Sequence, residues 1–160
     1  MALNAATTLP TTKHTVQDPQ SLNRKKVKQV DLFWEGIPPK STFQQRDKNF
    51  HPTACARLAM AQWQAILEQT IPDEPLQGPL EFRMILTWPH TAESKREADR
   101  TGRSAVRKTT RPDGSNILKG VEDIMTRLGY WNDDAQLCIE HVERWYGIVP
   151  GVVIIAKELE

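Results

Sequence analysis

One strongly amphipathic helix in the second half of the chain constrains the fold more than any other feature. The run Asp113-Gly114-Ser115-Asn116 has turn and cap chemistry, with Ser115 and Asn116 as the expected helix caps, and Gly129 fits the left-handed residue that ends a helix. Apolar side chains recur between them at helical spacing, so this helix needs a second layer to bury them. They are Ile117, Leu118, Val121, Ile124, Met125 and Leu128.

Four segments with strand composition supply the second layer. Val27–Trp34 and Leu80–Trp88 precede the helix, whereas Leu137–Tyr146 and Gly151–Leu159 follow it. A second amphipathic helix, capped by Thr53, is expected from about residue 54 to residue 69. The order β-α-β-loop-α-β-β predicts a two-layer α/β (α+β) fold, in which a small mixed four-stranded sheet packs against two main helices.

Two segments lack any apolar period. Residues 1–23 are mostly Ala, Thr, Asn, Gln, Ser and Pro, which predicts a flexible N-terminal tail ahead of one domain at 24–160. His90–Arg111 has Val106 as its only large apolar side chain and is expected to be a long basic loop. Connections longer than about 12–15 residues are uncommon unless they are functional or disordered.

Composition excludes several classes of protein. The length of 160 residues suits one domain, and no stretch approaches the roughly 20 apolar residues that span a bilayer. The N-terminus lacks a secretory signal pattern, and two cysteines are too few for a disulfide scaffold or a zinc knuckle. We therefore expect a cytoplasmic protein with no membrane partner, in which Cys55 and Cys138 are reduced and buried.

The net charge of +1 conceals two opposite segments. Between Asp113 and Glu143, seven acidic residues outnumber two basic ones, whereas seven basic residues outnumber two acidic ones in the segment just before. The basic segment, with Lys40 and Arg46 from an earlier loop, is a candidate for contacts with a nucleic-acid backbone, although it can equally be a solvated loop. Its cations are Lys95, Arg96, Arg100, Arg103, Arg107, Lys108 and Arg111.

The acidic segment can approach phosphate through a divalent cation, because Mg²⁺ prefers carboxylates, waters and phosphate oxygens. Asp113 precedes the helix and Asp134 follows it; the chain can bring them together, although Asp113 can equally meet a carboxylate of another subunit. Lys119 can reach a phosphate near the helix start, or it can form an ordinary i,i+4 pair with Asp123. Asp133-Asp134 can also be a polar turn before a strand.

The acidic run carries a resemblance to a known family. Arg111 to Asp123, followed by Gly129 to Leu137, resembles the RusA family of phage and prophage Holliday junction resolvases. The shared pattern is a Pro-Asp pair, an asparagine, a lysine three residues later, an aspartate in the same helix, and Asp-Asp-x-Gln. Trp34–Lys40 and His51-Pro52-Thr53 are similar to the family's first strand, proline-rich loop and helix start.

The resemblance implies a homodimeric hydrolase that cuts four-way DNA junctions during recombination and repair in a bacterial host. It implies Mg²⁺ as the cofactor, with Mn²⁺ expected to substitute, and no small-molecule cofactor. Asp113 and Asp134 take the places of metal-binding catalytic aspartates, with Asp133 beside them, and Lys119 takes the place of the catalytic lysine. Asn116 and Asp123 also align.

One position departs from the family pattern. Ser115 stands where the family commonly has its second catalytic aspartate, and a neutral hydroxyl cannot supply the missing charge. Asp113, Asp133 and Asp134 can suffice with extra waters, or another carboxylate can substitute, Asp123 being the nearest candidate. A third possibility is a protein that binds junctions and cuts them poorly.

Two other classes of function remain open at this point. A non-catalytic DNA-binding module would bind junctions in a salt-sensitive way without cutting them, and a structural or inhibitory phage protein would have no such DNA affinity. A nuclease of the PD-(D/E)xK type fits Pro112-Asp113, but no acidic-x-Lys strand follows.

Overall fold

The computed structural model of the chain describes residues 28–39, 47–49 and 51–160. The predicted tail at 1–23 and the basic residues Lys40 and Arg46 lie outside the described residues. No helix in the described ranges is long and apolar enough to cross a membrane.

Five strands and three α-helices make up the described chain. The first half contains β1 (Gln29–Glu35), α1 (Ala54–Leu67), a 3₁₀ turn η1 (Glu68–Thr70) and β2 (Leu80–Pro89). The second half contains α2 (Ala92–Thr101), β3 (Ala105–Arg107), α3 (Gly114–Leu128), a 3₁₀ turn η2 (Asp134–Gln136), β4 (Leu137–Gly147) and β5 (Gly151–Glu158).

The strands form one mixed sheet in the order β1-β5-β2-β4-β3. β2 and β4 are parallel, which requires a crossover connection, and α3 lies in that connection. The other pairs, β1 with β5, β5 with β2 and β3 with β4, are antiparallel. The start of α3 lies against β4, where Gly114 is next to Val142 and Arg144.

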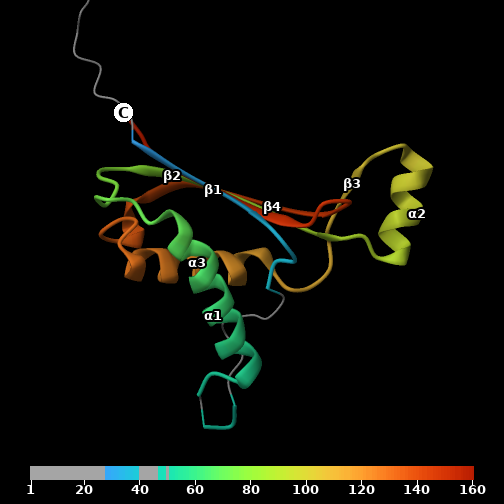
Figure 1. Ribbon diagram of the computed structural model, residues 1–160, viewed down its shortest axis with the longest axis horizontal. Helices are drawn as coiled ribbons and strands as arrows, with labels where there is room; N and C mark the ends of the chain where they lie inside the picture. The colour runs from blue at the N-terminus through green and yellow to red at the C-terminus, as the bar shows by residue number, and fades with distance from the viewer. Residues whose placement is uncertain (1–27, 40–46, 50) are drawn as a thin grey trace, which may run out of the picture.

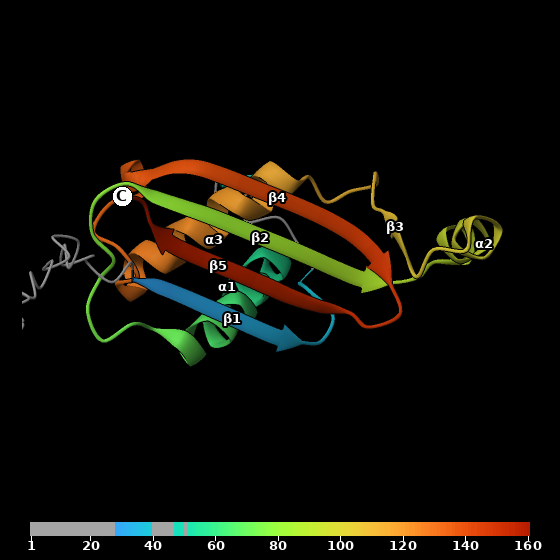
Figure 2. The same cartoon turned by 90° about the horizontal axis from the view of Figure 1, so that it is seen from above.

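Helices α1 and α3 lie together on one face of the sheet, and α2 stands beyond its end, next to β3 (Figure 1). Figure 2 looks onto the opposite face, over which no described helix lies. The core is the layer between the sheet and the α1/α3 pair. Strand β2 supplies alternate side chains to it, as predicted, and α3 supplies its apolar stripe. The buried members are Leu80, Phe82, Met84 and Leu86 of β2, Trp63 of α1, and Ile117, Val121, Ile124 and Met125 of α3.

The capping predictions for α1 and the end of α3 are confirmed. The Thr53 side chain accepts a hydrogen bond from the Ala56 amide at the start of α1. Gly129 ends α3 in the left-handed conformation with φ 83°, where a side chain would be strained.

The predicted α+β class and its two main helices are confirmed, but the sheet has five strands and there is a third helix, because His90–Arg111 is not one long loop. It contains α2 and the short strand β3. Thr91 and Ser94 form a capping box at the start of α2, and Gly102 ends it in the left-handed conformation. The buried side of α2 carries only Ser94 and Ala98. The sequence therefore has no periodic large apolar residues that would indicate this helix.

The prediction that both cysteines are buried is also wrong. Cys55 and Cys138 are free and exposed. Cys55 is the second residue of α1. Cys138 is the second residue of β4, in a stretch that does not pair with β3.

Candidate active site

The start of α3 places Asp113 at the N-cap position in extended conformation, with φ −69° and ψ 136°. Its side chain makes no capping hydrogen bond and is exposed. Ser115 and Asn116, predicted as caps, lie inside the first turn because the helix begins at Gly114, so that prediction is wrong. The Asp113 carboxylate therefore remains available at the positive end of the helix dipole.

Two cations hold the backbone just before Asp113. Lys108 Nζ donates to the carbonyl oxygens of Thr110 at 2.9 Å and Arg111 at 2.7 Å, and to the Thr110 hydroxyl at 2.6 Å. Arg144 on β4 donates from Nη1 to the Thr110 carbonyl at 3.3 Å and to the Pro112 carbonyl at 2.7 Å. The peptide bond that enters Pro112 is cis.

Lys108 is buried between two aromatic rings. Only 6% of its surface is exposed, and Nζ lies 5.3 Å from the Trp88 ring centroid and 5.1 Å from that of Tyr146. Such contacts stabilise a desolvated ammonium. With its hydrogen bonds directed into the 110–111 backbone, Lys108 stabilises this turn, in contrast to the exposed cations around it.

Lys119 joins α3 to the turn η2. Its Nζ pairs with Asp134 Oδ2 at the start of η2 and with Asp123 Oδ1, one helical turn further along α3, at 3.1 Å. The hydrogen bonds that Lys119 donates to the two carboxylates raise its pKa, and the Lys119 ammonium lowers the pKa of Asp134. The i,i+4 pair with Asp123 that the sequence offered is therefore present, and a contact with Asp134 that the sequence did not predict accompanies it.

The Asp-Asp-x-Gln motif forms a compact turn. Asp133 Oδ1 accepts from the Ala135 amide at 2.8 Å, and Gln136 Oε1 accepts from the Asp133 amide at 3.1 Å, which completes a capping box. Gln136 Nε2 also donates to the Gly78 carbonyl at 3.0 Å. These bonds attach the turn to the rest of the fold and leave Asp134 directed at Lys119.

The turn and α3 border a hollow of about 540 Å³. Three of the predicted metal ligands line it, and Met60 of α1 contributes from across the gap. The lining residues are Met60, Asp123, Thr126, Arg127, Asn132, Asp133 and Asp134.

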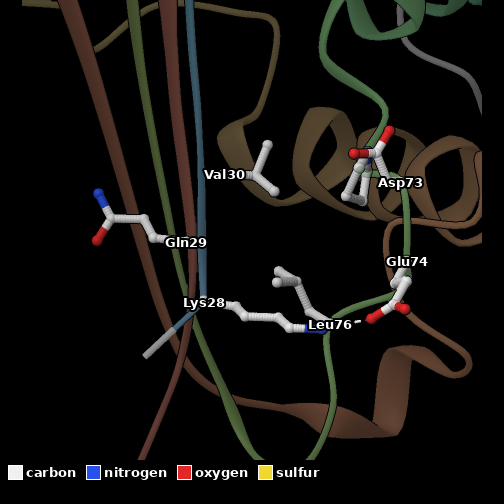
Figure 3. Close-up of a pocket in the computed structure, with 7 residues that line it drawn as sticks. Lys28, Gln29, Val30, Asp73, Glu74 and Leu76 are labelled. Carbon is white, nitrogen blue, oxygen red and sulfur yellow. Dashed lines mark hydrogen bonds and ion pairs between the residues drawn. The ribbon is translucent and has the colours of Figure 1, made fainter. Parts of the chain in front are cut away.

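A different hollow, of about 650 Å³, contains none of the predicted site residues. It lies between the start of β1 and the 72–76 segment, where Lys28 Nζ pairs with Glu74 Oε2 at 2.7 Å. In Figure 3, Lys28 and Val30 point toward that segment and Gln29 points away. The chemistry of this hollow is one exposed ion pair beside apolar side chains.

Glu122, which the sequence did not single out, is a buried carboxylate beside this group. Its side chain is 5% exposed, and Oε1 has no hydrogen-bond partner among the described residues. Burial raises its pKa to about 7, helped by the negative charge of Glu140 and opposed by Lys119.

No group of three or more His, Cys, Asp or Glu side chains within the described residues is arranged to hold a metal ion. Asp123 and Asp134 converge on the Lys119 ammonium, and no hydrogen bond or ion pair of the described chain links Asp113 to them. The expected cluster of Asp113, Asp133 and Asp134 is thus not assembled. The donor chemistry nevertheless fits a hard cation, since carboxylates outnumber the single ammonium and one buried oxygen is unpartnered.

The basic residues divide by environment. Lys95, Arg96 and Arg100 on α2, and Arg103 after it, are exposed and form no ion pair within the described ranges. Arg107 of β3 lies 4.1 Å from the Trp145 ring centroid and 3.7 Å from Glu143 Oε2. Arg111 is exposed next to Asp113.

Comparison with known proteins decides the family. The family model described as endodeoxyribonuclease RusA matches residues 36–156, which is most of the chain. The chain belongs to the RusA family. Membership confirms the resemblance carried by the Arg111–Leu137 run and places this RusA protein among the endodeoxyribonucleases, which are hydrolases.

Two relatives of this RusA protein show how far the similarity extends. YqaN of Bacillus subtilis strain 168, an uncharacterised protein, is 28% identical over 97 residues, which cover 59% of this chain and 68% of YqaN. The crossover junction endodeoxyribonuclease rusA of Lactococcus phage r1t is 50% identical over 30 residues, or 19% of this chain and 23% of the phage protein.

Sequence reasoning missed two residues of the site, Glu122 and Arg144. A signal existed for Glu122, since it lies four residues after Leu118 and three before Met125, within the apolar stripe of α3. The sequence gives no such signal for Arg144. Its contact with the 110–112 backbone depends on the pairing of β4 with β3.

Proposed function

We propose that this RusA protein is a Mg²⁺-dependent, structure-selective endonuclease that resolves four-way DNA junctions by phosphodiester hydrolysis, in DNA recombination and repair. The observation that carries this proposal is the group around Lys119, in which α3 and the Asp-Asp-x-Gln turn meet. Family membership supports the class of reaction.

Asp113 and Asp134 are proposed to hold the cation, with Asp133 beside them and Asp123 as a further ligand. When bound, Mg²⁺ or Mn²⁺ supplies charge neutralisation at the phosphate and a more acidic water. Lys119 stays protonated throughout the neutral range, because its carboxylate neighbours raise its pKa. Its ammonium can therefore donate hydrogen bonds to a phosphate oxygen on which negative charge develops.

The proposed DNA-binding surface consists of exposed cations on and around α2. Each phosphate contact releases counterions, which makes binding salt-dependent. Lys108 is excluded from the proposed DNA-binding residues, because its ammonium is buried in the turn before Asp113. The set comprises Lys95, Arg96, Arg100, Arg103, Arg107 and Arg111, together with Lys40 and Arg46 from the sequence.

Resolution of a junction needs two cuts related by symmetry, and a twofold homodimer presents two equivalent sites. We therefore propose a homodimer as the active form. The similarity to a phage protein supports a phage or prophage origin and action inside the bacterial host cell.

The proposal is tested by incubating end-labelled four-way junction and matched linear duplex with protein in Mg²⁺ or in EDTA. We expect cuts in the junction alone, only with Mg²⁺, and none from Asp134→Asn. Asp31→Asn is the matched control, because Asp31 is an exposed aspartate of β1 whose carboxylate, within the described residues, pairs only with Gln29. An uncut junction, or equal cutting by Asp134→Asn, would refute the proposal.

A second candidate function is junction binding without cutting, and Ser115 is the observation that favours it. Ser115 is exposed in the first turn of α3, where it adds no charge next to Asp113. This alternative requires salt-sensitive junction binding by the wild type and cutting only by Ser115→Asp.

A further inference from the structure

Glu122 is placed where a carboxylate opposes folding. It lies on the buried side of α3 with 5% of its surface exposed, and Oε1 has no hydrogen-bond partner in the part of the chain that the structure describes. A buried acceptor left without a partner loses its bonds to water and gains nothing in return. A leucine or methionine at this position would extend the apolar stripe, so packing does not account for the residue.

The charged groups around Glu122 are mostly negative. The charged groups that act on it are Glu140 of β4, Asp134 of η2, Asp123 and Lys119. Lys119 is already paired with Asp123 and Asp134. The site therefore holds more negative charge than Lys119 neutralises.

The spacing along α3 places Glu122 on the same face of the helix as Lys119. Ser115, Lys119 and Glu122 are separated by four and then three residues, so they share one face of the helix. Long side chains in a helix lean toward its N-terminus, which aims the Glu122 carboxylate at the turn that contains Lys119. Asp123, on the next position round, is exposed and held by Lys119 at 3.1 Å.

We propose that Glu122 is a ligand of the divalent cation and supplies the carboxylate that Ser115 cannot. This inference rests on the proposed function, since it concerns the same cation. Under this inference, the residue that replaces the missing family aspartate is Glu122, whose carboxylate is buried. The exposed Asp123 does not take that role.

The assignment is tested by measuring how tightly the full chain binds Mn²⁺ without DNA. Binding is followed by calorimetry and by the loss of the paramagnetic resonance signal of free Mn²⁺. We expect Glu122→Gln to weaken Mn²⁺ binding at least tenfold. This is the smallest loss of affinity that is typical when a group supporting a metal site is removed. Glu140→Gln is the matched control, because it removes a neighbouring charge of the same cluster. It should weaken binding no more than about threefold, as expected for a field effect alone.

The double variant Ser115→Asp with Glu122→Gln should recover most of the Mn²⁺ affinity. Binding by Glu122→Gln within twofold of wild type, or equal losses in Glu122→Gln and Glu140→Gln, would overturn the assignment.

Thermal melting separates this role from a structural one. Without metal at pH 8, Glu122→Gln should melt at or above the wild-type temperature, because it removes a buried charge. Saturating Mn²⁺ should then raise the wild-type melting temperature by more than that of the variant. A metal-free variant that melts well below wild type, with equal Mn²⁺ shifts in both, would overturn the proposal.

The two proposals fail differently. A wild type that binds Mn²⁺ through Glu122 and cuts no junction would refute the nuclease function and keep the ligand. A wild type that binds no Mn²⁺ at millimolar concentration would overturn both.

Discussion

The Lys119 ammonium of α3 pairs with the Asp134 carboxylate of η2, across 15 positions of sequence. This contact brings the helix and the Asp-Asp-x-Gln turn into one group. The same ammonium holds Asp123 on its own helix. Lys119 therefore lies against Asp134, the proposed cation ligand, and the chemistry proposed for this protein depends on that position.

Lys119→Met should reduce junction cleavage by about 10²–10³-fold, the loss typical of one stabilising donor. The pair is largely exposed, so stability should change little. Single-turnover cleavage and a melting curve check both expectations. A variant that cuts at the wild-type rate would exclude Lys119 from the reaction.

Lys108→Met should act through stability and positioning rather than through DNA affinity. It removes three hydrogen bonds to the 110–111 segment, which should destabilise the fold by about 1–3 kcal/mol. Cleavage should fall because the backbone before Asp113 loses its support. The salt dependence of junction binding should keep its wild-type slope.

Arg96→Gln is the matched comparison for Lys108. Arg96 is exposed on α2, so its loss should reduce the slope of log affinity against log salt by about 0.9 and leave the melting temperature unchanged. If Lys108→Met changes the slope and Arg96→Gln does not, the roles given to these two cations are reversed.

The metal-free protein should lose stability as pH rises from about 5 to 8. The pKa of Glu122 in the fold is about 7, above its ordinary value of 4.5, so the folded state binds the proton more tightly than the unfolded chain does. The stability from this proton is present below pH 4.5 and is lost as pH rises through 7. Chemical denaturation across this range should show the decline in wild type and a smaller one in Glu122→Gln.

Ser115→Asp should strengthen divalent-cation binding, because it adds a carboxylate near Asp113 at the start of α3. Cleavage should rise or stay constant in a protein that is already active. Activity that appears only in this variant would establish the wild type as a junction-binding protein.

The sequence was sufficient where large side chains repeat with a clear period. The stripe from Ile117 to Leu128 and the alternation of Leu80, Phe82, Met84 and Leu86 predicted α3 and β2 correctly. It was insufficient for α2, whose buried side consists of Ser94 and Ala98, and for β3, which has three residues. Hydrophobic periodicity carries no signal for elements this small or this polar.

Charge counting had a similar limit at the site. It grouped Lys108 with its exposed neighbours, since position in the sequence says nothing about the Trp88 and Tyr146 rings that enclose it. The family pattern named Asp113, Lys119 and Asp134, and the fold brings the last two together. The position of Glu122 within the apolar stripe was a signal in the sequence, but its burial depends on how α3 packs against the sheet.

The most direct test of the nuclease function is the product formed from a supercoiled plasmid that extrudes a cruciform. A twofold dimer with two active sites should make two symmetric cuts and convert the plasmid to linear DNA when Mg²⁺ is present. Asp134→Asn should leave it supercoiled, and Asp31→Asn should match wild type. An intact cruciform with wild type, or linear product from Asp134→Asn, would contradict the proposed function.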